Sequence, residues 1–248
     1  MVRRQGTREK EIRGSAGYLE EPWRATEQDL ESERRFGLGS RWLIRCVHRF
    51  VIWITRHWLA MFNLAVGMVL GLAWLAPWLM LHGQASVGQL LYLAYRPLCH
   101  QLPERSFFLG GERPWYTFEQ LSAALGYDAP ARYVGNPQLG YKVAFCERDV
   151  AIFAGYLLMG LLFALFRRRI KPLPWQALLA ATLPLAIDGT VQLFGLAESN
   201  WQRRIATGLL FGLAVTWFAL PWIQRGMAEA QEIALRSWKE EDAHDGSS

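Results

Sequence analysis

The sequence predicts an all-α membrane protein with four transmembrane helices and a long, partly helical extracytoplasmic loop between the first and second of them. Three observations lead to this fold class. Of the 248 residues, 52% are hydrophobic, charged residues gather at the two ends, and four separate segments are almost free of charge. An apolar run of about 18 residues or more is long enough to cross the roughly 30 Å hydrocarbon core of a bilayer as a helix.

The four predicted spans differ in how consistently apolar they are. Their ranges are 58–81, 150–166, 175–196 and 205–223. The first contains no Asp, Glu, Lys or Arg, the second is at the short edge of what can cross, and the third is interrupted by one acid, Asp188. Buried helices of a soluble domain are the alternative interpretation, but such helices have polar faces and these segments do not.

The segments that flank this membrane domain, residues 58–223, are polar. Residues 1–40 alternate in charge sign without an apolar period, which predicts a largely disordered tail, and residues 224–248 form a second polar tail. Residues 41–57 predict a basic juxtamembrane helix, because three arginines at every fourth position would lie on anionic lipid headgroups rather than on nucleic acid. No cleavable signal peptide is recognisable, so the first span is expected to act as its own targeting signal.

Basic residues predict the orientation in the membrane. "RWLIRCVHRFVIWITRH" precedes the first span and "RRRIKPLP" joins the second span to the third, and neither contains an acid. Cytoplasmic flanks carry such an excess of Lys and Arg. With four spans, both termini are therefore expected in the cytoplasm and the loop 82–149 outside, in a multi-pass protein of the cell membrane whose evident partner is the lipid bilayer.

The predicted outer loop contains short helices and a polar motif. "SVGQLLYLAYRPL" is apolar and too short to span, so it is expected along the outer interface. "RPLCHQLPERSFFLGG" follows as a turn. Farther on, Thr117 and Gln120 have the spacing of a capping box that opens a short helix. The loop ends in "FCERDVAIFAG", where Asp149 is well placed to cap the second span.

Three separated motifs, "CHQLPERSF", "CERDVAIFAG" and "DGTVQLFGLAESNWQRRIATGLLFG", occur in this order. On these motifs the chain resembles the family known as domain of unknown function 2085, small prokaryotic membrane proteins, over roughly Arg96 to Gly212. Two departures concern the second motif. The insert 112–145 precedes it where many relatives have a short link, and it reads Cys-Glu-Arg-Asp where many have Cys-x-Arg-Cys. The resemblance implies a fold and a set of residues, and no activity.

Polar side chains of the three motifs are the candidate site residues. The catalytic candidates are His100, Glu104 and Asp188. The binding candidates are Gln101, Arg105, Ser106, Arg148, Gln192 and Arg204. A charged Asp near the middle of a span costs about 2.5–3.5 kcal/mol on insertion scales, so Asp188 should face the bundle interior with a partner. Arg105, Arg148 and Arg204 are the candidates, and we predict Arg204 first, with Gln192 adding a hydrogen bond and Arg105 closing the site.

The cysteines allow three interpretations. Cys99 and Cys146 share the predicted outer side, where disulfides persist, and a bridge between them would be worth roughly 4 kcal/mol in the chain-entropy model. A metal site formed by Cys99, His100 and Cys146 is an alternative, although neighbouring residues point in different directions. A nucleophilic Cys99 with His100 as its base is the third. Cys46 is expected to be a free thiol on the cytoplasmic side.

These residues suggest a polar pocket that opens outward and binds a small anion or a lipid headgroup, with chemistry on it if His100, Glu104 and Asp188 converge. A non-enzymatic assembly or accessory subunit is the alternative, in which the polar cluster only fixes the loop. A transporter is a third interpretation, but four spans without an internal repeat are few for a transporter. No nucleotide-binding loop, haem motif or hydrolase elbow is present, which argues against several standard enzyme classes and leaves any cofactor unknown.

Overall fold

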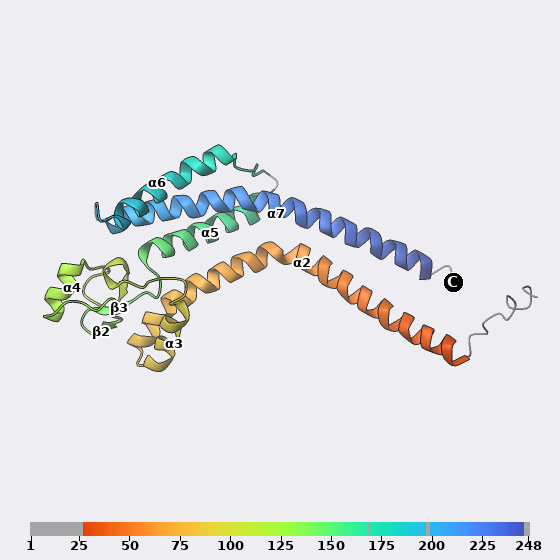
Figure 1. Ribbon diagram of the computed structural model, residues 1–248, viewed down its shortest axis with the longest axis horizontal. Coiled ribbons are helices and arrows are strands. Elements are labelled where there is room, and N and C mark those ends of the chain that lie inside the picture. The colour runs from red at the N-terminus through yellow and green to blue at the C-terminus, as the bar shows by residue number, and fades with distance from the viewer. Residues whose placement is uncertain (1–26, 168, 197–198, 246–248) are drawn as a thin grey trace, which may run out of the picture. The chain divides into compact units, whose positions relative to one another are not determined.

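The computed structural model describes residues 27–167, 169–196 and 199–245 of the chain. The chain forms two compact units, Met1–Phe50 and Val51–Ser248. The residues of the core clusters and of the cavities all belong to the second unit. Figure 1 shows the elements in chain order, and within the described residues the long elements are helices.

Four long helices are α2 (Glu27–Leu81), α5 (Glu147–Phe166), α6 (Trp175–Leu193) and α7 (Trp201–Asp245). In the described part of the chain, three segments are long and apolar enough to cross a membrane: Trp42–Leu81, Glu147–Phe166 and Trp201–Lys239. All four predicted spans are helical, but α6 is not among these three. Gln176, Asp188 and Gln192 lower its apolar character, so composition alone supports three spans and not the four predicted.

The first and last helices extend farther than the sequence predicted. Helix α2 begins at Glu27, inside the segment 1–40 expected to be disordered, and it includes the predicted juxtamembrane helix without a break. Helix α7 continues to Asp245, through most of the predicted polar tail. Both extensions are rich in Glu, Arg and Ala or Leu, which favour helix even where no apolar period is present. Residues 1–26 of the predicted tail lie outside the described residues.

Helix α7 packs against both α5 and α6, and the three helices lie side by side in Figure 1. Glycines bring the backbones of α5 and α7 into contact. A Cβ added to Gly212 would lie 2.3 Å from the carbonyl oxygen of Ile152, and one added to Gly155 would lie 2.9 Å from the carbonyl oxygen of Leu209. This close contact of α7 is thus made inside the bundle. Nothing lies within 4 Å of a Cβ added to Gly71 of α2.

Among the residues that the structure describes, apolar side chains form three buried clusters. One joins α2, α5 and α7 through Trp58, Leu59, Phe163 and Leu220. A second lies where α2 meets the following loop and includes Ala73, Ala76, Tyr92, Tyr95 and Phe145. The third belongs to the loop itself and is built on Phe108, Tyr116, Leu121, Ala129 and Leu139. The loop therefore has a core of its own.

Residues 82–149 form a small folded region. Its elements are α3 (Ala85–Tyr95), a 3-10 turn η2 (Pro103–Arg105), β1 (Phe108–Leu109), α4 (Phe118–Leu125), β2 (Gly135–Asn136) and β3 (Gly140–Lys142). The strands form an antiparallel sheet in the order β1-β3-β2. The predicted capping box is confirmed, because the Thr117 side chain accepts from the Gln120 N–H while the Gln120 side chain accepts from the Thr117 N–H. The sheet was not predicted.

Large apolar side chains remain exposed along the helices. They include Leu158, Leu161 and Leu165 on α5 and Leu179, Leu183 and Ile187 on α6. Continuous exposed apolar surface of this kind is unfavourable in water and is typical of helices that face lipid.

Candidate functional site

The first turn of α5, Cys146 to Asp149, is where the polar motifs of the sequence meet in space. Cys146 is the N-cap, with an extended backbone, and its Sγ accepts a hydrogen bond from the Asp149 N–H at 3.4 Å. The prediction that Asp149 caps this helix is therefore wrong. Asp149 lies in the first turn instead, where the helix dipole still favours its negative charge.

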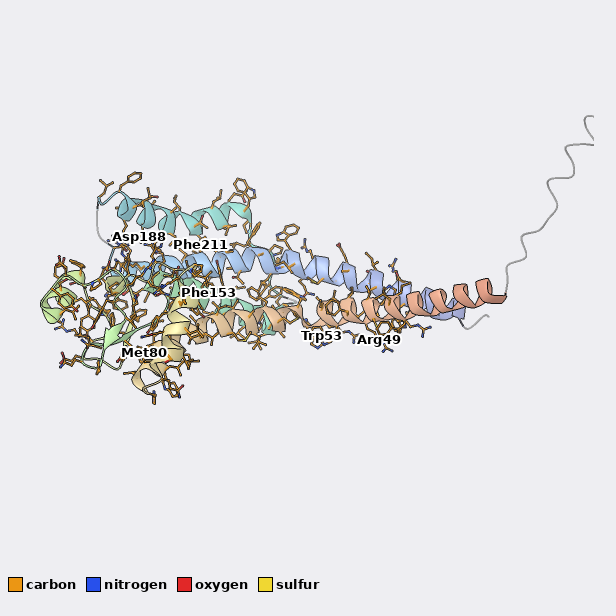
Figure 2. All side chains as sticks on the ribbon, turned by 60° about the horizontal axis from the view of Figure 1, so that its bottom comes forward. Arg49, Trp53, Met80, Phe153, Asp188 and Phe211 are labelled. Carbon is orange, nitrogen blue, oxygen red and sulfur yellow. The ribbon has the colours of Figure 1, made fainter. Side chains whose placement is uncertain are left out.

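Arg148 of this turn binds Asp188 of α6. An Nη2–H of Arg148 donates to Oδ2 of Asp188 at 2.5 Å, and the two side chains are 21% and 6% exposed. Gly189 has no side chain in the way, and a Cβ there would lie 3.5 Å from Nη1 of Arg148. Asp188, near the C-terminal end of α6 (Figure 2), thus has a partly buried guanidinium partner, as its position required.

The predicted pairing of Asp188 with Arg204 is wrong. Arg204 of α7 donates instead to Oε2 of Glu147 at 3.1 Å, and these side chains are 10% and 2% exposed. Arg204 also approaches the carbonyl oxygen of Glu104 at 3.5 Å. The expected hydrogen bond from Gln192 to the Asp188 pair is not found among the described residues. Successive residues of one turn, Glu147 and Arg148, therefore bind two different helices.

A cavity of about 510 Å³ lies beside the Glu147–Arg204 pair. It is lined by side chains from η2, from the start of α4, and from α5, α6 and α7. Those that matter most below are Glu104, Arg105, Trp115, Glu147, Gln192, Ser199, Trp201 and Arg204. Within the described part of the chain, Arg105 forms no ion pair, and Nε of Arg204 has no hydrogen-bond partner. The cavity thus combines guanidinium groups with aromatic rings and carboxylates.

The three catalytic candidates do not converge. Glu104 lines the cavity just described. Asp188 lines a different cavity of about 450 Å³, whose other walls include Leu183, Ile187 and Val191. His100 is exposed and lines neither. A mechanism in which these three side chains act on one substrate does not fit this geometry.

Two of the binding candidates hold the loop together. Gln101 is buried and has a positive φ of 55°, and its side-chain amide donates to the Tyr92 carbonyl oxygen at 2.8 Å. Its own carbonyl oxygen accepts from the Nζ of Lys142, a fully buried lysine. Burial lowers the pKa of Lys142 to about 8. Ser106 is also buried, and its hydroxyl donates to the Leu102 carbonyl oxygen at 2.8 Å.

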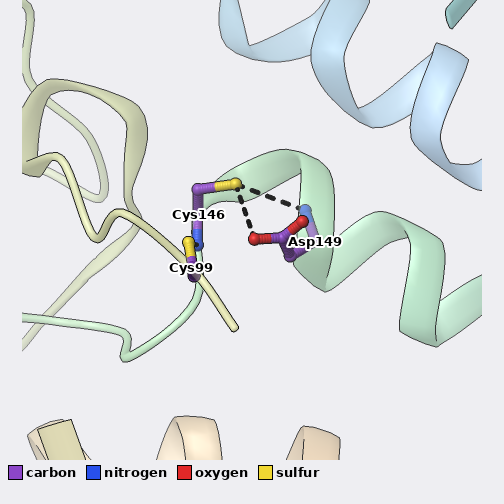
Figure 3. Close-up of side chains that lie close together, drawn as sticks. All are labelled: Cys99, Cys146 and Asp149. Carbon is purple, nitrogen blue, oxygen red and sulfur yellow. Dashed lines mark hydrogen bonds between the residues drawn. The ribbon is translucent and has the colours of Figure 1, made fainter. Parts of the chain in front are cut away.

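The cysteines gather at the same turn of α5. The Sγ atoms of Cys99 and Cys146 and a carboxylate oxygen of Asp149 lie within 4.8 Å of one another (Figure 3). The two sulfurs are not bonded to each other, so the disulfide stays a prediction. Hydrogen bonding between the two thiols lowers the pKa of Cys99 and raises that of Cys146. The predicted metal-site alternative included His100 as its third residue. In the structure the third residue near the two cysteines is Asp149 instead.

Several residues of these sites were not singled out from the sequence. Glu147, Lys142 and the rings of Trp115 and Trp201 are the main ones. Glu147 had a usable signal, because an acid and a base at consecutive positions of one helical turn must face different neighbours. Trp115 and Trp201 lie far apart in the sequence, and only the folded loop brings their ring centroids to 6.2 Å.

Long apolar helices with exposed leucines place the protein in the class of helical integral membrane proteins. Comparison with known proteins gives the particular family. The family described as "Predicted membrane protein (DUF2085)" matches residues 138–218. An uncharacterized protein of Methanocaldococcus jannaschii is 31% identical over 156 residues, which are 59% of this chain and 80% of the relative. The chain belongs to this family of predicted membrane proteins. No solved structure matches it.

Proposed function

We propose that this protein is a four-span protein of the cell membrane, with both termini in the cytoplasm, that binds the phosphate-bearing headgroup of a lipid in the cavity beside Arg204. The observation that carries the proposal is the position of Arg105 and Arg204 at one cavity. Guanidinium groups bind phosphate oxygens through paired N–H donors. Arg105 forms no direct ion pair among the described residues, although its charge acts on the nearby Glu147 carboxylate, so its N–H donors remain available to a ligand.

The second cavity supports a lipid over a free anion. It lies on the same two helices, α6 and α7, and its walls are mainly apolar: Ala180, Leu183, Pro184, Ile187 and Val191. Gln192 lines the polar cavity and its neighbour Val191 lines the apolar one. A molecule with a polar head and an acyl chain fits these neighbouring polar and apolar cavities along α6 better than inorganic phosphate does.

The proposal requires α6 to cross the membrane as the fourth span. Its exposed side chains, Leu179, Leu183 and Ile187, suit a lipid environment, and the pair with Arg148 offsets much of the cost of burying Asp188. A cysteine replacing Ser247 should then resist a membrane-impermeant thiol reagent in intact cells. A cysteine replacing Asp128, on the exposed loop, should react. Labelling at Ser247 would mean that only three helices cross.

Native mass spectrometry in detergent tests the ligand. We expect phosphatidylglycerol to bind, and diacylglycerol and inorganic phosphate not to bind at the same concentrations. Arg105→Gln should weaken lipid binding at least tenfold, since a hydrogen bond to a charged group is worth about 1.5–3 kcal/mol. Arg113→Gln is the matched control, because Arg113 is exposed and does not line the cavity. Equal binding by the two variants would refute the headgroup site, and competition by phosphate alone would identify a free anion as the ligand.

An accessory membrane subunit is the second candidate. It is favoured by the way polar groups satisfy one another, with Arg148 on Asp188 and Arg204 on Glu147, and by the large exposed apolar surface. In that case Arg105→Gln changes no lipid binding, and the protein co-purifies from mild detergent in a larger complex.

A further inference from the structure

We propose that Cys99, Cys146 and Asp149 bind a divalent transition-metal ion of the zinc type. This inference is independent of the lipid site. The three residues come from different parts of the fold: Cys99 from the loop after α3, Cys146 from the N-cap of α5, and Asp149 from the first turn of that helix (Figure 3). Their potential ligand atoms all lie within 4.8 Å of one another.

The distances suit a shared ion. Zinc binds thiolate sulfur at about 2.3 Å and carboxylate oxygen at about 2.0–2.2 Å in tetrahedral geometry, which places two ligands of one ion about 3.6–3.8 Å apart. The Sγ of Cys146 and Oδ2 of Asp149 are 3.1 Å apart. A small change in the χ1 angle of either side chain would open that distance to the separation that zinc requires. Thiolate and carboxylate together are ligands that zinc accepts.

Backbone N–H groups point at both sulfurs. The Cys146 N–H donates to Sγ of Cys99 at 3.3 Å, and the Asp149 N–H donates to Sγ of Cys146 at 3.4 Å. Outer hydrogen bonds of this kind orient metal ligands. The positive end of the α5 dipole lies at the same point and favours negative charge there. Cys99 is only 8% exposed and belongs to an apolar cluster, so the group is shielded from bulk water on that side.

The ligand set has three protein atoms. His100, adjacent to Cys99, is exposed and is not part of the group. Three protein ligands leave the fourth tetrahedral position to water or to another molecule, which is the pattern of zinc sites that interact with a ligand rather than of closed structural sites.

Metal content of the purified protein tests the proposal. The protein is isolated in detergent with a phosphine reductant and no chelator, and its zinc is measured by plasma mass spectrometry. We expect about one zinc per chain, and a thiolate-to-cobalt charge-transfer band when Co²⁺ replaces it. Cys99→Ser, Cys146→Ser and Asp149→Asn should each lower the metal to background. Asp149→Cys, which keeps a ligand atom, should retain it. Cys46→Ser is the matched control, because Cys46 lies outside the group.

Gel filtration and circular dichroism show which variants fold. If a serine variant does not fold, the zinc contents of Asp149→Cys and Cys46→Ser still test the metal site. Zinc at background in the reduced wild-type protein overturns the proposal. So does an equal loss in Cys46→Ser. An intact mass lower by two hydrogens, restored on reduction and mapped to Cys99 and Cys146, would identify the pair as a disulfide and would also overturn it.

Discussion

Replacing Asp188 by asparagine removes the charge that faces the Arg148 guanidinium at 2.5 Å. Breaking a buried ion pair by removing one partner costs about 3–5 kcal/mol, because the other charge stays buried without compensation. Arg148 is 21% exposed, so water relieves part of this cost and the lower end, about 3 kcal/mol, applies. For a chain of this size 1 kcal/mol shifts Tm by about 2–4 °C, so Asp188→Asn should lower Tm by about 6–12 °C.

A double-mutant cycle identifies the partner. Arg148→Gln should cost about as much as Asp188→Asn, and the double variant should cost little more than either alone, since the interaction can be lost only once. Arg204→Gln is the matched comparison, because Arg204 binds Glu147 and not Asp188. Its effect should add to that of Asp188→Asn.

The assay is thermal unfolding of detergent-purified protein at a fixed scan rate, followed by intrinsic tryptophan fluorescence. Strong coupling between positions 188 and 204, with additive effects at positions 188 and 148, would refute the assignment of the two pairs. Additivity in both cycles would mean that neither arginine compensates Asp188.

Two further predictions concern packing and pH. Gly212→Ala places a methyl group 2.3 Å from the Ile152 carbonyl oxygen and should lower the free energy of unfolding by about 1–3 kcal/mol. Gly71→Ala, with nothing within 4 Å, should leave Tm unchanged or slightly higher. Equal losses of stability in the two variants would contradict the α5–α7 contact. Burial lowers the pKa of Lys142 from 10.5 to about 8, so between these values the unfolded chain binds a proton that the folded chain lacks, and this residue adds stability as pH rises through that window. Thermal scans from pH 7 to pH 10 should show wild type gaining on Lys142→Met, and parallel curves would contradict a depressed pKa.

Local patterns in the sequence were enough to predict the helices and one of their caps. The apolar runs specify helix wherever they occur, and the capping box at Thr117 is a contact between residues three apart. The sheet was missed because strands of two or three residues, such as Gly135–Asn136, carry no periodic signal. The lengths of α2 and α7 were missed because disorder was inferred from charge, while helix propensity continues through charged sequence.

The members of the site could be predicted, but their pairing could not. Arg204 is the nearer arginine to Asp188 along the chain, whereas Arg148 is 40 positions away and is the actual partner. Which arginine faces Asp188 depends on how each helix is rotated about its own axis. The close approach of Gly155 and Gly212 constrains that rotation for α5 and α7, and it depends on residues far apart in the sequence.

The first turn of α5 therefore has to face three partners at once, which fixes the rotation of this helix about its axis. Cys146 lies beside Cys99 of the loop, Glu147 binds α7 and Arg148 binds α6. Each residue of an α-helix advances by about 100°, so one residue added to or deleted from this turn would swing all three contacts away from their partners at once. A single substitution there removes one of these contacts, whereas a change of length would remove all three. Length variation in relatives should therefore fall outside this turn.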